Sequence, residues 1–282
     1  MSRQPSTPPP PPVVARVRIR YAKRGRLRFT SHRDFARALE RAVRRAAAPI
    51  AYSAGFSPHP RISYVGATPT GVASEAEYLE LALAERVDVD ELRAALDAAL
   101  PVGLDVVECV EAQPGSGNLA DRIDASRWWV ELPGVTAGEC RRAAAVFLGT
   151  EVVTVERLTK DGRRELDARA PVVRLDVLEG QVGASTGDVR SPCAILDVVV
   201  RQATPAVRPD DVLAALRAVA GLASPVPPRA TRLAQGRLDD NGGLTDPLAA
   251  DRGGALPPRA VGGEAGAPAA RPEPSVGTTP AS

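Results

Sequence analysis

The stretch "ARVRIRYAKRGRLRFTSHRDFARALERAVRRA", residues 15–46, changes its hydrophobic period halfway along. At its start, apolar residues alternate with arginines, as in a half-buried strand: Val17, Ile19 and Tyr21 against Arg16, Arg18 and Arg20. After Ser31 the apolar residues recur at helical spacing: Phe35, Leu39, Ala42, Val43 and Ala46. Ser31 is a good N-cap, and Asp34 three residues later completes a capping-box pattern. The stretch therefore predicts a strand, a turn at Gly25 and a helix over about 31–47.

The next seventy residues extend this pattern. Residues 49–53 predict a short strand that "RISYVG" (61–66) extends, and the alternating "AEYLELALA" (76–84) predicts another. A helical pattern follows over 88–101, and then a strand pattern over 103–112. The order is β-α-β-β-α-β, the ferredoxin-like arrangement.

A second unit repeats the order. Its predicted helices are 136–149, which opens with a Thr136/Glu139 capping box, and 209–222, which Gly221 closes. Its predicted strands are 127–133, 151–159, one of 170–180 and 193–202, and 228–238. The predicted fold class is therefore α+β, as two tandem ferredoxin-like units with disordered N- and C-terminal tails.

The domain boundaries follow from composition. Residues 13–112 are predicted as a ferredoxin-like domain with a basic face, 113–126 as a linker and 127–238 as the second domain. The Pro-rich lead 1–12 and the Gly/Pro/Ala-rich tail 239–282 have no hydrophobic periodicity, so both are predicted to be disordered.

Charge is spread unevenly along the chain. Residues 1–70 hold 14 Arg and Lys against two acidic residues, Asp34 and Glu40, which gives +12; since the whole chain carries +2, the remainder carries −10. This asymmetry favours a polyanionic partner for the first part of the chain. The alternative is a solvated arginine face in an Arg-rich proteome.

Several function classes lack support in the sequence. It contains no P-loop, GxGxxG, GxSxG or HExxH motif. Its three cysteines, Cys109, Cys140 and Cys193, form no metal-binding cluster and are interpreted as small buried apolar residues. No apolar run approaches the roughly 20 residues of a membrane span, and the N-terminus has no apolar signal region. A cytoplasmic location without membrane contact is therefore expected.

The loop "GFSPHPRISYVGATPTG" (55–71) holds one of the two histidines between prolines. In the predicted topology it meets the start of the first helix and the start of the third strand. The residues expected to form one anion or substrate site there are Ser31, His32, His59, Arg61, Glu75 and Glu77. Metal binding or acid–base catalysis by the two histidines and two glutamates is an alternative. A purely structural role, with the glutamates paired to Arg26 and Arg28, is another.

A nucleic-acid surface is a second candidate. Arg18 and Arg20 share a predicted open sheet face with Tyr78, and such a face can bind single-stranded RNA by stacking and phosphate contacts. The predicted nucleic-acid-binding residues are Arg18, Arg20, Arg26, Arg28, Arg37 and Arg41.

Three blocks resemble a known family: "LRFTSHRDFARALERAVRRA" (27–46), "AYSAGFSPHPRISY" (51–64) and "GVASEAEYLELAL" (71–83). They are similar to signature blocks of the radical-SAM-associated (radical-SAM-linked) protein family. This bacterial domain of unknown function is found stand-alone or fused to the C-terminus of radical SAM proteins. The resemblance covers roughly residues 14–235. It implies a radical SAM partner that carries a [4Fe–4S] cluster and S-adenosylmethionine; the chain itself is expected to need no cofactor, because it lacks clustered thiolates.

Three functions are consistent with these observations. The first is an accessory, substrate-presenting partner of a radical SAM enzyme that binds RNA or another anionic substrate. The second is a stand-alone, metal-independent RNA-processing enzyme that uses His32 or His59, by analogy with ferredoxin-like endoribonucleases of CRISPR systems. The third is a protein–protein scaffold without substrate contact.

Overall fold

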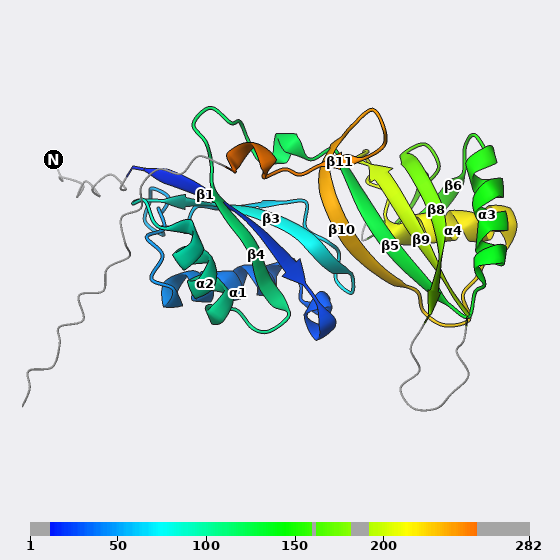
Figure 1. Ribbon diagram of the computed structural model, residues 1–282, viewed down its shortest axis with the longest axis horizontal. Coiled ribbons are helices and arrows are strands. Elements are labelled where there is room, and N and C mark those ends of the chain that lie inside the picture. The colour runs from blue at the N-terminus through cyan, green and yellow to red at the C-terminus, as the bar shows by residue number, and fades with distance from the viewer. Residues whose placement is uncertain (1–11, 160–161, 182–191, 253–282) are drawn as a thin grey trace, which may run out of the picture.

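The computed structural model describes residues 12–159, 162–181 and 192–252. It is a mixed α+β structure in which one large mixed sheet runs through the molecule (Figure 1). Four α-helices lie among the described residues, two against each half of this sheet. No helix of the described part is long and apolar enough to cross a membrane.

The first half is built from the predicted alternation of strands and helices. Its elements are β1 (Ala15–Lys23), the 3-10 helix η1 (Gly25–Phe29), α1 (His32–Arg45), β2 (Ile62–Val65), β3 (Ala73–Leu83), α2 (Val89–Ala99) and β4 (Leu104–Glu111). The strands lie in the order β4-β1-β3, with β2 antiparallel on β3. Val17, Ile19 and Leu81 face the helices and pack in one core with Phe35 and Leu39 of α1.

The second half adds a protruding hairpin to a similar plan. Its elements are η2 (Ala120–Arg122), β5 (Ala125–Pro133), α3 (Ala137–Gly149), β6 (Thr154–Thr159), β7 (Gly162–Asp167), β8 (Val172–Gln181), β9 (Pro192–Arg201), α4 (Pro209–Ala220), β10 (Arg229–Leu238), β11 (Leu244–Thr245) and η3 (Ala249–Asp251). The sheet order is β10-β5-β9-β8, whereas β6 and β7 pair only with each other. Both alternatives for a middle strand, 170–180 and 193–202, are therefore strands. Thr136 and Glu139 form the predicted capping box of α3.

The two halves share one sheet. β3 and β10 pair in parallel, with Ala73 opposite Thr231 and Ser74 opposite Arg232. Around this short ladder, the carboxylate of Glu77 binds the guanidinium of Arg232, and both side chains are buried. The sheet therefore continues across the predicted domain boundary.

Two segments expected to be outside the packed structure cover the sheet face opposite α1 and α2. Leu119 and Ile123 come from the predicted linker, and Leu248 comes from the predicted tail. All three are buried in a cluster with Ala76 and Tyr78 of β3. The prediction of disorder is wrong for residues 239–252, because their burial depends on strands far away in the sequence. Residues 1–11 and 253–282, the other predicted disordered segments, lie outside the described residues.

Candidate nucleic-acid interface

The outer side of α1 carries a row of exposed arginines. Arg33, Arg37, Arg41 and Arg44, here called the arginine face, are all exposed. The buried residues of α1 are Phe35, Leu39, Ala42 and Val43. At 100° per residue, the four arginines fall within an arc of about 80° that points directly away from the buried stripe. The row extends about 16 Å along the helix.

The arginine face is free of acidic partners. Neither its four members nor the neighbouring Arg45 takes part in any ion pair among residues 12–159, 162–181 and 192–252. Asp34 and Glu40, the two acidic residues of α1, each lie about 20° outside this arc and form no ion pair within the described residues. Asp34 accepts a hydrogen bond from the Ser31 hydroxyl at 2.7 Å, which supports the predicted N-cap. Burial, with a smaller contribution from Glu40, raises the pKa of Tyr64 to about 12.

More cations and an exposed aromatic ring lie before α1. Arg26 is exposed, and Arg28 is half-buried with its guanidinium 4.7 Å from the centre of the Phe29 ring. The Phe29 side chain is 59% exposed. Neither arginine pairs with Glu75 or with another acid of the described chain, so the predicted pairing of Arg26 and Arg28 with the glutamates is wrong.

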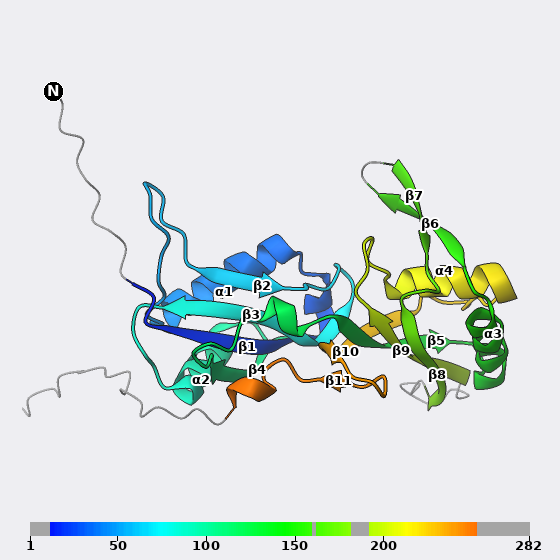
Figure 2. The same cartoon turned by 90° about the horizontal axis from the view of Figure 1, so that it is seen from above.

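A loop of residues 52–61, the Pro-His-Pro loop, follows the other end of α1. Tyr52 forms a β-bridge to Pro60. Ser53 and His59 are joined twice: the Ser53 N–H donates to the His59 carbonyl at 2.9 Å, and the His59 N–H donates to the Ser53 hydroxyl at 3.0 Å. His59 and Arg61 are exposed. The loop projects from the sheet beside the end of α1 (Figure 1, Figure 2).

Backbone pairing places this loop far from Glu75. The Arg61 N–H donates to the Ala51 carbonyl at 2.9 Å, and the Arg61 carbonyl accepts from the Ala82 N–H at 3.0 Å. Ala82 is near the end of β3, whereas Glu75 is near its start. Seven residues of extended strand separate them, about 23 Å. His59 and Arg61 therefore do not share a site with Glu75.

His32 begins α1, whereas the Pro-His-Pro loop follows the end of that helix. Its ring is 4.9 Å from that of Tyr64, in edge-to-face contact, and Tyr64 pairs with Leu79 in the middle of β3. The predicted meeting of the two histidines is therefore wrong. Residues 49–53 make only two isolated bridges, Ile50 to Leu83 and Tyr52 to Pro60, and the paired strand is β2. The Pro-His-Pro loop thus precedes the second strand, at the end where α1 finishes, instead of following it.

Both glutamates are committed to other partners. Glu75 binds Arg24, and Glu77 binds Arg232 in the second half and accepts from the Thr68 N–H at 3.1 Å. The described residues contain no group of three or more His, Cys, Asp or Glu side chains that could hold a metal ion. An acid–base pair of a histidine with Glu75 or Glu77 has no support in this arrangement.

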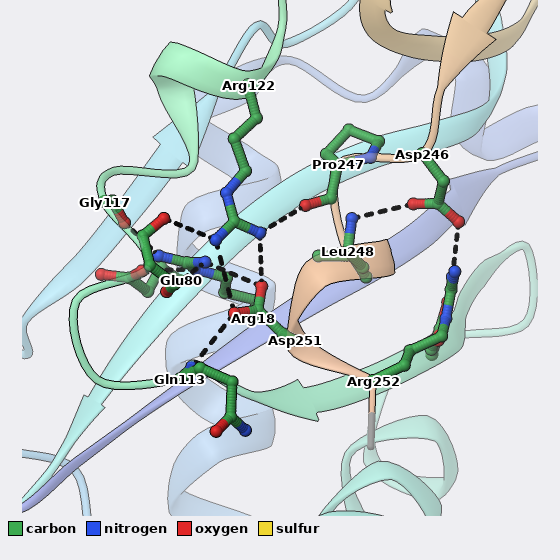
Figure 3. Close-up of polar contacts among 12 residues, drawn as sticks. Arg18, Glu80, Gln113, Gly117, Arg122, Asp246, Pro247, Leu248, Asp251 and Arg252 are labelled. Atoms are coloured by element: carbon green, nitrogen blue, oxygen red, sulfur yellow. Dashed lines mark hydrogen bonds and ion pairs between the residues drawn. The ribbon is translucent and has the colours of Figure 1, made fainter. Parts of the chain in front are cut away.

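The predicted open sheet face is covered. Arg18 is 2% exposed and is enclosed by Glu80 of β3 and Asp251 of η3 (Figure 3). Arg20 donates from Nε to the Glu75 carbonyl at 2.9 Å, and Tyr78 is 3% exposed. Arg18 and Tyr78 are therefore not available to RNA on an open face, whereas Arg20 is half-buried.

The row of exposed arginines therefore lies on α1, and not on the sheet face as predicted. The sequence prediction includes Arg37 and Arg41 but omits Arg33 and Arg44, and it omits the exposed Phe29. A signal for the arginines is present in the sequence. Positions 33, 37, 41 and 44 recur at helical spacing opposite the apolar stripe, which is the same periodicity that predicts the helix.

Comparison with known proteins identifies a family. The family model described as "Uncharacterized protein conserved in bacteria (DUF2344)" matches residues 16–209, which include the arginine face and the Pro-His-Pro loop. The chain belongs to the DUF2344 family. The family match ends within the second half of the sheet, at the start of α4.

Other comparisons add little to the DUF2344 assignment. No curated protein matches the chain. Among solved structures, the cryo-EM structure of the encapsulated DyP-type peroxidase from Mycobacterium smegmatis aligns over 82% of this chain and 94% of that chain, with 13% identity and a TM-score of 0.18. A TM-score this low carries no argument about fold or function.

Proposed function

We propose that this DUF2344 chain is an accessory subunit of a radical SAM enzyme that binds RNA, or another anionic substrate, and presents it to that enzyme. The observation that carries the proposal is the arginine face: four exposed guanidinium groups in a row with no acidic partner among the described residues. Of the twenty exposed arginines among the described residues, seven form an ion pair with a carboxylate. The arginine face is therefore distinguished by the alignment of four unpaired arginines along one side of a single helix. Unpaired guanidinium groups bind phosphates and release counterions.

The radical SAM partner follows from the sequence resemblance. The enzyme, in this proposal, carries the [4Fe–4S] cluster and S-adenosylmethionine. The cysteines of this chain do not fit a cluster: Cys109, Cys140 and Cys193 lie on three separate elements, all buried and free. Burial raises the pKa of Cys109 to about 12 and that of Cys140 to about 11, which disfavours the thiolate that ligates iron.

We further infer that the two halves are tandem ferredoxin-like units. The strand orders β4-β1-β3-β2 and β10-β5-β9-β8 support this, because both equal the order 4-1-3-2 when each half is numbered along the chain. The β6-β7 hairpin is then an insertion between the first helix and second strand of the second unit.

A variant that lacks three arginines tests RNA binding. Replacing Arg37, Arg41 and Arg44 together with glutamine is expected to weaken binding of a labelled single-stranded RNA. It is also expected to lower the slope of log K against log salt by about 2, since each phosphate contact contributes about 0.7 for single strands. Fluorescence anisotropy over a range of salt concentrations measures both quantities. Stability is expected to stay within about 0.5 kcal/mol, because the three side chains are exposed.

The matched control removes the same charge elsewhere. Arg141, Arg163 and Arg229 are exposed arginines of the second half that already pair with glutamates. Their triple glutamine variant is expected to bind RNA like the unaltered chain. Equal weakening by both variants would contradict a specific surface on α1. Cleavage of RNA by the purified chain alone would favour the alternative of a stand-alone enzyme, and absence of RNA binding would favour a scaffold.

The accessory role makes a separate prediction. Co-expressed with a radical SAM protein from the same genome, the chain is expected to elute with that protein as one complex in size-exclusion chromatography. RNA binding by the complex is expected to remain sensitive to the triple Arg37, Arg41 and Arg44 variant. A chain that elutes alone at micromolar concentration while still binding RNA would refute the accessory role and leave the RNA-binding surface in place.

A further inference from the structure

We infer that the ligand of the arginine face is single-stranded RNA, and that Phe56 at the tip of the Pro-His-Pro loop is a stacking platform for one of its bases. This inference rests on the proposed function, since it specifies which form of RNA the surface takes. It adds a second contact of a different chemical kind to the electrostatic one.

Phe56 is an extreme case of aromatic exposure. Its side chain is 96% exposed, the highest value of any aromatic residue among those described, whereas Phe35 and Phe147 are fully packed in the cores. A solvent-facing phenyl ring contributes nothing to folding, since only buried apolar surface is stabilising. The ring therefore has both faces available to a partner.

The loop holds this ring in a defined place. The Ser53–His59 hydrogen bonds and the Tyr52–Pro60 bridge close the base of the loop. Pro58 and Pro60 fix the backbone on either side of His59. Gly55, with φ of 122°, makes the turn before Phe56, in a backbone region that other residues rarely adopt. A closed base and a short tip reduce the entropy lost when the ring binds a base.

Arginines lie at the base of the loop that carries this ring. Six residues separate Arg45, the last residue of α1, from Tyr52 at the base of the loop. Arg61, on the outgoing strand of the loop, is exposed. At the other end of the arginine face, Phe29 is 59% exposed and lies under the Arg28 guanidinium. The surface is therefore a row of cations with an exposed aromatic ring near each end, the combination by which proteins hold single strands.

The aromatic rings distinguish single strands from duplexes. In an RNA duplex the base faces are stacked inside the helix, so a protein reaches mainly phosphates and 2′-hydroxyls. A single strand exposes its base faces, and every base can stack on an aromatic ring. Arginines alone would serve either form, whereas Phe56 adds affinity only for unpaired nucleotides.

An anionic membrane surface is the competing ligand for cations beside an apolar tip. The residue types favour RNA. Beside Phe56 the tip of the loop contributes Ala54, Gly55, Ser57 and Pro58, so one large apolar side chain would have to anchor the protein. Marginal, reversible binding is all that a single apolar anchor gives.

Three chains with different residues at position 56 test the inference: the unaltered protein, Phe56→Leu and Phe56→Trp. Leucine keeps the apolar character but removes the aromatic face, whereas tryptophan keeps both. Each is titrated with a single-stranded RNA, with the duplex of the same sequence, and with vesicles of phosphatidylcholine and phosphatidylserine. Phe56→Leu is expected to weaken single-strand binding about 5- to 150-fold, the range for loss of one stacked base, and to leave duplex binding unchanged. Phe56→Trp is expected to bind like the unaltered chain.

The outcomes separate this inference from the function on which it rests. In one outcome, RNA binding depends on Arg37, Arg41 and Arg44, is equally strong for single-stranded and duplex RNA, and does not change in Phe56→Leu. This outcome overturns the stacking role of Phe56 and leaves the arginine face as the RNA-binding surface. Loss of single-strand and duplex binding alike in Phe56→Leu also overturns it. Binding to the vesicles without binding to single-stranded RNA overturns both proposals in favour of a membrane surface.

Discussion

Replacing Asp251 with alanine is expected to lower the free energy of unfolding by about 3–5 kcal/mol, the usual loss when one partner of a buried ion pair is removed. The Asp251 carboxylate is fully buried. It accepts hydrogen bonds from Arg18 at 2.7 Å, from Arg122 at 2.6 Å and from the Gln113 N–H at 3.1 Å (Figure 3). Without it, the guanidinium of Arg18 keeps only Glu80 as an acidic partner and that of Arg122 keeps none among the described residues. Urea denaturation followed by circular dichroism measures the loss.

Asp240→Ala is the matched control, since Asp240 lies in the same segment, is exposed and has no partner among the described residues. It is expected to change stability by less than about 0.5 kcal/mol. A loss as small in Asp251→Ala would show that the segment does not hold the sheet face.

The pH dependence supplies a second measurement. Burial opposes ionisation of Asp251, but the hydrogen bonds from Gln113, Arg18 and Arg122 outweigh this effect and lower its pKa.

The sign of the pH effect follows from that lowered pKa. A carboxyl whose pKa is lower in the folded state stabilises the fold fully above its unfolded pKa, about 3.9 for Asp. The contribution is lost as the pH falls through the lowered value. The stability difference between the unaltered protein and Asp251→Ala is therefore expected to be constant from pH 5 to pH 7 and to shrink below about pH 4.

The composition of residues 239–282 predicts that their deletion leaves folding intact, and the structure reverses this for 239–252. Nothing in "LTDPLAADR" (244–252) has strand or helix periodicity. Leu248 and Asp251 are nevertheless buried, because β1, β3 and residues 113–122 supply an apolar pocket and two guanidinium groups that fit them. Burial of this kind depends on contacts across more than 100 residues, which local pattern does not encode.

Elements with a strong hydrophobic period could be predicted from the sequence. The alternation of Val17, Ile19 and Tyr21 and the stripe of Phe35 and Leu39 each predicted the element and its buried face, and all five side chains lie in one core. A hydrophobic period of 2 or 3.6 over several residues reflects which face of the element packs on the core. The prediction of such an element therefore does not depend on how the loops around it fold. The pairing of β3 with β10 involves only two pairs of residues, and no periodic pattern in the sequence predicts it.

The candidate site was only partly predictable for a related reason. Arg37 and Arg41 could be placed on the outside of α1 because that helix is strongly amphipathic. The place of His59 depended on whether residues 49–53 or 62–65 form the paired strand, and both segments are short and apolar. The prediction that residues 49–53 form the paired strand placed the Pro-His-Pro loop at the end of β3 near Glu75. In the structure the loop lies at the other end of β3, about 23 Å away. Local pattern does not decide between two such strands.

The junction of the two halves has few backbone contacts, so its side chains are expected to matter greatly. Glu77, 2% exposed, binds the Arg232 guanidinium, which also lies 5.4 Å from the centre of the Trp128 ring. Lys23 is 5% exposed nearby. Burial lowers the pKa of Lys23, and the charge of Glu77 acts in the opposite direction. Glu77 is the ion-pair partner of Arg232, whereas the Lys23 ammonium donates a hydrogen bond to the Pro69 carbonyl at 3.3 Å.

Glu77→Ala is expected to lower the free energy of unfolding by about 3–5 kcal/mol, because it leaves the Arg232 guanidinium buried without an acidic partner in the described structure. It also leaves the Thr68 N–H without the carboxylate oxygen that accepts its hydrogen bond at 3.1 Å. The double variant Glu77→Leu with Arg232→Met is expected to recover most of the loss, since apolar side chains of similar volume often replace a buried ion pair at little cost. Urea denaturation of the single and double variants gives both values.

Glu85→Ala is the control for this pair, as Glu85 is exposed just beyond β3 and has no partner among the described residues. It is expected to change stability by less than about 0.5 kcal/mol. A double variant as unstable as Glu77→Ala would mean that the geometry of the Glu77–Arg232 bridge, and not the cost of an unpaired buried charge, holds the junction. A loss in Glu77→Ala no larger than in Glu85→Ala would refute the argument altogether. The short β3–β10 ladder and the contact from Gln235 Nε2 to the Ala76 carbonyl, at 2.6 Å, would then suffice to join the halves.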